Sequence, residues 1–181
     1  MDFVTFWSGF KWFLVVIFIG LILAIVLAVL GAGWDRFLRY VEALPELLFQ
    51  QRCQELGIAD TDSMSGRQFE LWLARLFKDA GYKVQLTPYQ GDRGADLIVT
   101  HPNGKRYAVQ AKRFSGNVNV DALGEVLRGM HWYDCDGCMV VTNSDFTPVA
   151  REEAARAGIK LIGRKELADF VERVRKQKKS R

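Results

Sequence analysis

The segment at residues 107–114, YAVQAKRF, carries residues whose types and spacing could do chemistry. Side chains alternate along a β-strand, so Gln110 and Lys112 stand two residues apart on one face, next to apolar neighbours. A lysine is rarely buried without a partner. An amide oxygen and an ammonium beside a carboxylate could hold a divalent cation and activate water. The question is which carboxylate lies opposite this strand.

The turn that precedes this strand predicts the carboxylate. In HPNGK, residues 101–105, the Pro-Asn-Gly triplet suits a three-residue hairpin loop, a type I turn followed by glycine in the left-handed region. This loop sets Asp96 opposite Gln110, and Lys112 lies one step further along the same face. A loop one residue shorter or longer would turn Asp96 to the other face.

These side chains suit a Mg²⁺ or Mn²⁺ ion. Asp96 would be the main ligand, and the Gln110 side-chain oxygen and the Ala111 carbonyl would be weaker, neutral ligands. Glu70, at the border of a helix's apolar stripe, would bind through water or orient a second ion. Lys112 would orient the attacking water and stabilise the transition state of phosphodiester hydrolysis. A structural Asp–Lys pair on a sheet face is the alternative, because ion pairs imitate catalytic sites.

Periodicity and capping residues predict the elements that must position this group. Ser65 and Gln68 form a capping box before a helix that ends at Gly81, and Thr147-Pro148 begins another helix, which runs to about Ala157. Three adjacent strands followed by alternating helices and strands predict an α/β domain with a mixed sheet flanked by helices. The strands are expected at residues 82–87, 95–100, 105–113, 138–142 and 159–162, and the remaining helices at 120–133 and 164–176.

With these motifs in order, the sequence resembles a known family. The segments FELWLARLFKDAGYKVQLTPYQGDRGADLIVT, YAVQAKRF and MVVTNSDFTPVAREEAARAGIKLIGRKEL are similar to the catalytic domain of Mrr-type restriction endonucleases, a branch of the PD-(D/E)xK nuclease superfamily. The resemblance covers residues 65–172. It implies a restriction-endonuclease-like mixed β-sheet flanked by helices and Mg²⁺-dependent endonucleolytic cleavage of DNA, in restriction or DNA processing.

The resemblance also implies roles by position. Asp96 matches the family's motif aspartate, Gln110 and Lys112 match its QxK element, and Glu70 matches the acidic residue of the first helix. Most superfamily members have Asp or Glu where this chain has Gln110, whereas the Mrr branch typically has glutamine. No helix-turn-helix or other DNA-reading module is recognisable in the sequence, so it indicates no target sequence.

Nucleic-acid binding is expected to use local positive charge, because the formal net charge of the chain is only +4. Much of the positive charge lies in a basic tail at residues 173–181. Phosphate contacts, which are salt-sensitive and blind to sequence, are predicted for five cations, Arg93, Lys105, Arg106, Arg113 and Arg128. The expected partners are DNA and a second copy of the chain, because a double-strand break by a one-site fold would usually need a homodimer.

The N-terminal residues 1–34 lie outside the resemblance and are predicted to be a transmembrane anchor. Residues 12–34 carry no charge, and about 20 apolar residues span a bilayer core. Trp12 and Trp34 bracket the run, where interfacial aromatics usually lie. Membrane lipid is therefore a further expected partner.

Residues 35–64 are predicted to form a juxtamembrane amphipathic connector, interrupted at Pro45 and ending in a polar hinge at residues 59–66. Arg36 and Arg39 favour a single-pass protein of the inner, cytoplasmic membrane with its catalytic domain in the cytoplasm.

Other functions and other sites stay open at this point. A non-catalytic protein that tethers DNA to the membrane would bind DNA without cleaving it, and an interaction protein whose nuclease fold has lost its substrate would not bind DNA. His131, Cys135 and Cys138 resemble part of a zinc site but fall short of the four ligands that a closed site needs. Asp92 is a reserve candidate for the main metal ligand.

Overall fold

The structure is a computed structural model that describes residues 18, 21–22, 31–39, 41–53, 55–88 and 93–180. The chain divides into two compact units, Met1–Leu47 and Leu48–Arg181. Within the described residues, we find no helix with the length and apolar character that a membrane crossing requires. Most of the predicted span at residues 12–34 lies outside the described residues.

The described residues 31–39 and 41–52 are helical, and they comprise the end of the predicted anchor and the first part of the predicted amphipathic connector. The expected interruption at Pro45 is wrong, because the helical backbone continues through that residue. A proline removes only one backbone donor, so the helix keeps its other hydrogen bonds. Several large apolar side chains of this segment are 41–61% exposed, namely Trp34, Phe37, Leu38, Val41, Leu47 and Leu48.

The second unit contains a five-stranded mixed sheet with helices, which confirms the predicted α/β class. The strand order is β1-β2-β3-β4-β5, in which the first three strands are antiparallel neighbours and the last three are parallel neighbours. The elements in chain order are η1 (Ala59–Ser63), α2 (Gly66–Asp79), β1 (Lys83–Leu86), β2 (Leu97–Thr100), β3 (Arg106–Lys112), α3 (Asp121–Trp132), β4 (Gly137–Thr142), α4 (Pro148–Ala157), β5 (Lys160–Ile162) and α5 (Arg164–Lys179).

The helix ends follow the predicted capping chemistry. The Ser65 hydroxyl accepts a hydrogen bond from the backbone N–H of Gln68, whose own side chain accepts from the backbone N–H of Ser65. The Thr147 hydroxyl accepts from the backbone N–H of Ala150, with Pro148 in the first helical turn of α4. These bonds satisfy donors that a helix start otherwise leaves without partners.

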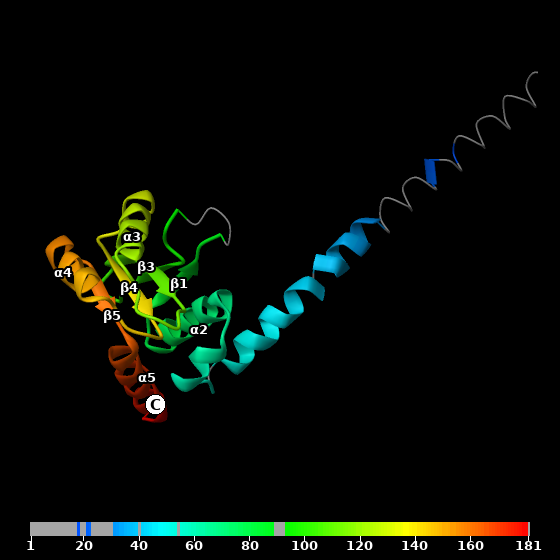
Figure 1. Ribbon diagram of the computed structural model, residues 1–181. Coiled ribbons are helices and arrows are strands. Elements are labelled where there is room, and N and C mark those ends of the chain that lie inside the picture. Colours follow the sequence, from blue (N-terminus) through cyan, green and yellow to red (C-terminus); the bar gives the residue numbers. More distant parts are fainter. Residues whose placement is uncertain are drawn as a thin grey trace, which may run out of the picture. The chain divides into compact units, whose positions relative to one another are not determined.

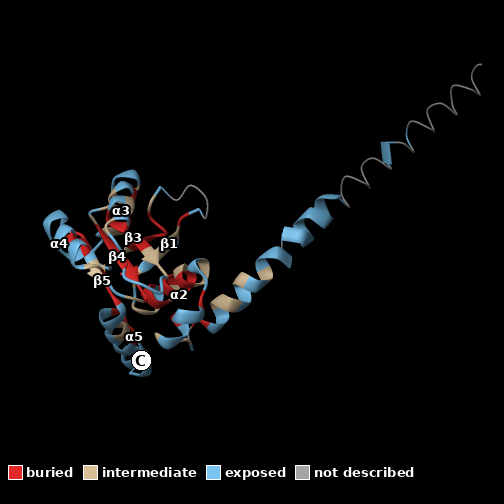
Figure 2. Cartoon of the chain, in the orientation of Figure 1, coloured by how far each residue is buried: buried red, intermediate tan, exposed pale blue. Residues whose placement is uncertain are grey.

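Helices cover both faces of the sheet. Along β3, Val109 belongs to the core shared with α2 and α5, whereas Ala108 belongs to the core shared with α3 and α4. Figure 1 shows these two helix pairs on opposite sides of the strands. Figure 2 shows the buried residues gathered on the central strands and on the helix faces that meet them. Gln110 and Lys112 have the same parity as Ala108, so they project toward the α3 side.

The predicted hairpin register is confirmed. Val99 pairs with Tyr107 and Leu97 pairs with Val109, as the HPNGK loop requires. Gly104 has a φ of +90°, in the left-handed region that this loop needs. Asp96 directly precedes the last pair of this register, Leu97–Val109, and its side chain meets the Gln110 amide.

The expected hinge at residues 59–66 is instead part of the folded domain. Residues 59–63 form η1, and both Thr61 and Met64 are buried. The polar composition of this segment suggested a flexible linker, but its polar groups bind distant parts of the chain. The most important is Asp62, which is described with the candidate site.

Candidate functional site

Asp96 is held at the start of β2 by two hydrogen bonds to one of its oxygens. The Gln110 Nε2 and the backbone N–H of Ala111 each donate to Asp96 Oδ2 at 2.7 Å. The backbone N–H of Asp96 donates to the Val109 carbonyl at 2.9 Å, one residue out of the β2–β3 register, in which Leu97 pairs with Val109. Asp96 and Gln110 are only 7% and 5% exposed, so a carboxylate and an amide are buried together here.

The side-chain oxygen of Gln110 lies buried with no hydrogen-bond partner among the described residues. A buried polar atom without a partner costs free energy and is uncommon in folded proteins. The orphan oxygen stands on the same amide that donates to Asp96. A cation bound beside the carboxylate would satisfy it, so the donor set fits a hard divalent ion.

The partner of the Lys112 charge is Glu125, a residue that the sequence analysis did not single out. Its Nζ lies 2.5 Å from the Glu125 Oε2 on α3, and both side chains are about one-third exposed. Glu125 flanks the buried face of α3 formed by Ala122, Val126 and Gly129. The same border position that singled out Glu70 could have indicated Glu125. The five residues Asp96, Gln110, Ala111, Lys112 and Glu125 are named the Asp96 cluster below.

Helix α3 is pressed against the backbone that leads into Asp96. A Cβ added to Gly129 would lie 2.6 Å from the Ala95 Cβ and 2.9 Å from the Ala95 N. Gly94, with a φ of +93°, lies directly on the backbone carbonyl of Glu125. These contacts fix the distance between α3, which carries Glu125, and the strand that carries Asp96.

Glu70 lies in the other helix layer but at the same end of the sheet. It is on α2, beside Phe69 of the α2–α5 core, and it forms an ion pair with Arg67 at 3.0 Å. The segment that leads into α2 meets the end of β3, because Arg113 donates to the Asp62 carbonyl. Its predicted role as a water-mediated ligand stays a prediction.

The five cations predicted to contact phosphate are dispersed. Lys105 and Arg106 lie at the opposite end of β3 from Lys112, and seven strand residues span about 20 Å. Arg93 stacks over the Trp132 ring at 4.6 Å. Arg128 is exposed on α3, and Arg113 directly follows β3. Of the five, Arg113 alone adjoins Lys112 in the chain.

A second polar group, named the Asp62 cluster, ties η1 to β4 and α5. The Arg164 guanidinium donates to both Asp62 oxygens, at 2.7 and 2.8 Å, and Asn143 Nδ2 donates to Asp62 Oδ1 at 2.9 Å. The hydrogen bond from Arg164, and then the one from Asn143, lowers the pKa of the Asp62 carboxyl. The same hydrogen bond, which the Asp62 carboxylate accepts, raises the pKa of Arg164.

No group of three or more His, Cys, Asp or Glu side chains able to hold a metal occurs in the part of the chain that the structure describes. Burial raises the pKa of the Cys135 and Cys138 thiols, which opposes the thiolate form that zinc needs. The candidate Asp92 lies outside the described residues. Metal binding by the Asp96 cluster would therefore rely on one carboxylate and neutral oxygens.

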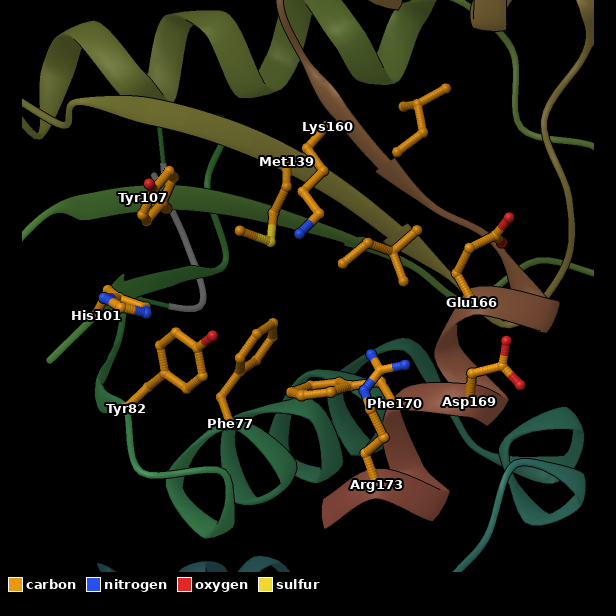
Figure 3. Close-up of a pocket in the computed structure, with 12 residues that line it drawn as sticks. Phe77, Tyr82, His101, Tyr107, Met139, Lys160, Glu166, Asp169, Phe170 and Arg173 are labelled. Atoms are coloured by element: carbon orange, nitrogen blue, oxygen red, sulfur yellow. The ribbon is translucent and has the colours of Figure 1, made fainter. Parts of the chain in front are cut away.

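A further hollow on the second unit lies away from the Asp96 cluster. It has a volume of about 540 Å³ and lies over β5 and the N-terminal parts of β3 and β4, between α2 and α5. Figure 3 shows the rings of Tyr82, Phe77 and Phe170 in a row facing Met139 and Lys160. We name it the aromatic pocket. Two smaller hollows, of about 350 and 300 Å³, adjoin Lys112 and Asn143 respectively.

Comparison with protein families gives one match that covers most of the second unit. A family model described as restriction endonuclease, Mrr_cat, matches residues 61–171. Among curated proteins, no sequence matches this chain.

One solved structure supports the fold. The DNA modification-dependent restriction endonuclease AspBHI aligns with a TM-score of 0.52 and 18% identity, covering 68% of this chain and 35% of that one. The restriction endonuclease MspJI in complex with a 27-mer oligonucleotide aligns with a TM-score of 0.41 and 21% identity, covering 56% of this chain and 26% of that one. A repair endonuclease from Pyrococcus abyssi aligns with a TM-score of 0.37 and 14% identity, covering 45% of this chain and 38% of that one. The last two scores are too low to support an argument, and this chain spans about a third of AspBHI.

Proposed function

Because this chain belongs to the Mrr_cat family of restriction endonucleases, we propose that its second unit is a divalent-metal-dependent DNA endonuclease that acts at the Asp96 cluster. The observation that carries the proposal is a buried carboxylate, Asp96, held by the Gln110 amide beside an amide oxygen that has no protein partner among the described residues. A purely structural arrangement would leave that oxygen unsatisfied at a cost in free energy.

The metal would be Mg²⁺ or Mn²⁺, held by the Asp96 carboxylate with the Gln110 Oε1 and the Ala111 carbonyl, and with Glu70 acting through water. Such an ion, when bound, lowers the pKa of coordinated water and offsets charge on a phosphodiester oxygen. Asp96 would contribute the only full negative charge among the direct ligands. Its removal should therefore weaken metal binding more than removal of Gln110.

Lys112 supplies the positive charge of the site. Its ammonium, about one-third exposed and 2.5 Å from Glu125, can hold a water molecule or a phosphate oxygen at the end of β3. A positioned cation stabilises charge that develops in the transition state. Glu125 is a positioning residue, because it touches Lys112 and its backbone braces Gly94.

The test is cleavage of supercoiled plasmid DNA in Mg²⁺ by the full chain purified in detergent. We expect nicking that EDTA stops, and a loss of at least about 100-fold in Asp96→Asn, which keeps the shape of the side chain. Asp169→Asn, an exposed aspartate of the aromatic pocket, is the matched control and should nick at the parent rate. Calorimetry with Mn²⁺ should detect uptake by the parent that Asp96→Asn loses.

A parent that does not nick, or an Asp96→Asn variant that nicks as well as the parent, contradicts the proposal. Salt-dependent DNA binding that survives Asp96→Asn, without any cleavage, would favour the alternative of a DNA tether.

Membrane attachment through residues 12–34 is the second part of the proposal. It is supported by the uncharged sequence of that span and by the exposed apolar side chains of residues 34–48. The domain would then face the cytoplasm from the inner membrane. Fractionation tests this part: the full chain should sediment with membranes and resist extraction by carbonate, and recovery in the soluble fraction would contradict it.

A further inference from the structure

Phe114 is an exposed aromatic side chain two residues beyond Lys112. It is 52% exposed and lines both of the smaller hollows at this end of the sheet. Single exposed apolar residues are ordinary on protein surfaces. Phe114 differs because a buried polar side chain, Asn143, holds its backbone in place. The fold therefore keeps the Phe114 ring at the surface.

The backbone of Phe114 is held by the Asp62 cluster. Its N–H donates to Asn143 Oδ1 at 2.8 Å, and Asn143 is only 3% exposed. Asn143 in turn donates to Asp62, which Arg164 grips with two hydrogen bonds. The segment after β3, which contains Phe114, is therefore linked through the Asn143 amide, just after β4, to η1 and the start of α5.

The ring of Phe114 is also fixed on one side. A Cβ added to Gly116 would lie 3.2 Å from the Phe114 Cε1, so the ring edge rests against that glycine. The Gly116 carbonyl accepts a hydrogen bond from the Ser144 hydroxyl at 2.7 Å, which ties this loop to the end of β4. The rest of the ring is left open toward solvent beside Lys112 and Arg113.

We propose that Phe114 is a stacking platform for an unpaired nucleobase of the substrate, next to the phosphate that Lys112 engages. This inference rests on the proposed function, and it adds that the substrate strand is single-stranded or locally unstacked at the cleaved bond. An aromatic ring can stack on any nucleobase, because every base has a π-face. The ring reaches that face only where the base has left its own stack.

The surroundings of the ring favour a nucleotide over an apolar ligand. Arg113 and Lys112 supply cations for the phosphates that flank a base, and the hollow on the Lys112 side also presents Asn117 and Asn119, whose amides can bond to base edges. The two hollows have volumes of about 350 and 300 Å³, within the range of small-ligand sites. Phe114 lines both hollows, so a nucleotide in either one could reach its ring.

The test measures binding of a short, dye-labelled single-stranded oligodeoxynucleotide by the full chain in EDTA, so that no cleavage intervenes. Phe114→Ala should weaken binding by about 5- to 100-fold, the range found when one stacked base loses its platform. Phe114→Leu keeps apolar bulk without a π-face and should be nearly as weak, whereas Phe114→Trp should bind as well as the parent. The slope of log affinity against log salt should stay unchanged, because no phosphate contact is lost.

Fluorescence of 2-aminopurine placed along the oligonucleotide gives a direct signature of stacking. One position should be quenched on binding to the parent and not on binding to Phe114→Ala. A Phe114→Leu variant that binds like the parent would overturn the inference, because apolar contact alone would then suffice. A parent that binds and nicks DNA while Phe114→Ala behaves identically would overturn the inference and leave the proposed function standing. A parent that neither binds nor nicks would overturn both.

Discussion

The Asp96 cluster and the aromatic pocket differ in what the fold has buried. The aromatic pocket is the larger hollow, yet its charged side chains, Lys160, Glu166, Asp169 and Arg173, are all exposed. At the other end of β3 the hollows are smaller, but Asp96, Gln110 and Asn143 are buried polar groups. Burying a polar group costs free energy unless it gains partners.

This difference teaches that ordered polar groups, rather than hollow size, locate the chemistry here. The rings of the aromatic pocket contact one another, with centroids 5.4 Å apart for Phe77 and Phe170 and 5.6 Å apart for Phe77 and Tyr82. Aromatic contacts of this kind stabilise a fold without any ligand. We therefore expect nuclease activity to depend on the Asp96 cluster and not on the aromatic pocket.

The largest effect on the nicking rate is expected from removing Lys112 of the Asp96 cluster. Lys160 of the aromatic pocket is its matched control. Lys112→Ala should reduce the nicking rate by about 100- to 1000-fold, because a preorganised cation near the developing charge is lost. Lys160→Ala, which removes an exposed lysine of the aromatic pocket, should leave the rate within about twofold. Initial rates of plasmid nicking measure both. Equal losses would break the comparison and assign the chemistry to both regions.

Several of the elements around the Asp96 cluster were predictable from the sequence because their signals are local. Ser65 and Gln68 cap α2 within four residues, and the HPNGK turn set the β2–β3 register that brings Asp96 to Gln110. Both depend on short-range geometry that a sequence displays directly.

The partners of the site were less predictable because they join distant segments. Asp62 binds Arg164 across 102 positions, and Lys112 binds Glu125 from another element. No periodicity encodes such pairs, so residues 59–66 were predicted to be a hinge and Glu125 was not singled out. The metal-binding roles of Asp96 and Glu70 remain predictions.

The second effect in size concerns the close contact between α3 and the strand that carries Asp96. Gly129→Ala would place a methyl group 2.6 Å from the Ala95 Cβ, so the helix or the strand must shift. We expect a loss of about 1–3 kcal/mol in the free energy of unfolding, typical of overpacking, with reduced nicking. Urea unfolding followed by circular dichroism measures the loss.

Gly124→Ala is the matched control on the same helix. Its added methyl would meet only the tip of the Arg128 side chain, at 3.7 Å. Alanine should then raise the free energy of unfolding by up to about 1 kcal/mol through helix propensity. If Gly129→Ala were as stable as Gly124→Ala, α3 would not be the brace of the Asp96 cluster.

The third effect tests the Asp62 cluster through its buried amide. Asn143→Ala leaves the Phe114 N–H without its acceptor and should cost about 1–3 kcal/mol in the free energy of unfolding. It should also weaken binding of single-stranded DNA, because the Phe114 platform loses its anchor. Asn119→Ala, an exposed amide that bonds only to Asp121 among its described contacts, should cost under about 1 kcal/mol. Similar costs for the two variants would contradict a special role for Asn143.

The smallest effect is a pH dependence of stability that belongs to Asp62. Its pKa lies below the ordinary value because Arg164 and then Asn143 bond to the carboxylate in the folded state. The unfolded chain therefore binds a proton more readily, and the contribution of Asp62 is fully present above about pH 5 and is lost as pH falls through the lower folded pKa. Asp62 is half-exposed, so solvent screening keeps this contribution below about 1 kcal/mol.

The measurement is the difference in the free energy of unfolding between the parent and Asp62→Asn, taken at intervals from pH 7 to pH 3. The difference should be constant down to about pH 5 and should shrink as the parent's Asp62 takes up a proton. Arg164→Gln removes the main cause of the lowered pKa, so in that background Asp62→Asn should produce little pH-dependent difference. A difference that grows on acidification would have the wrong sign, and the Asp62 cluster would then not be held by the charged form of Asp62.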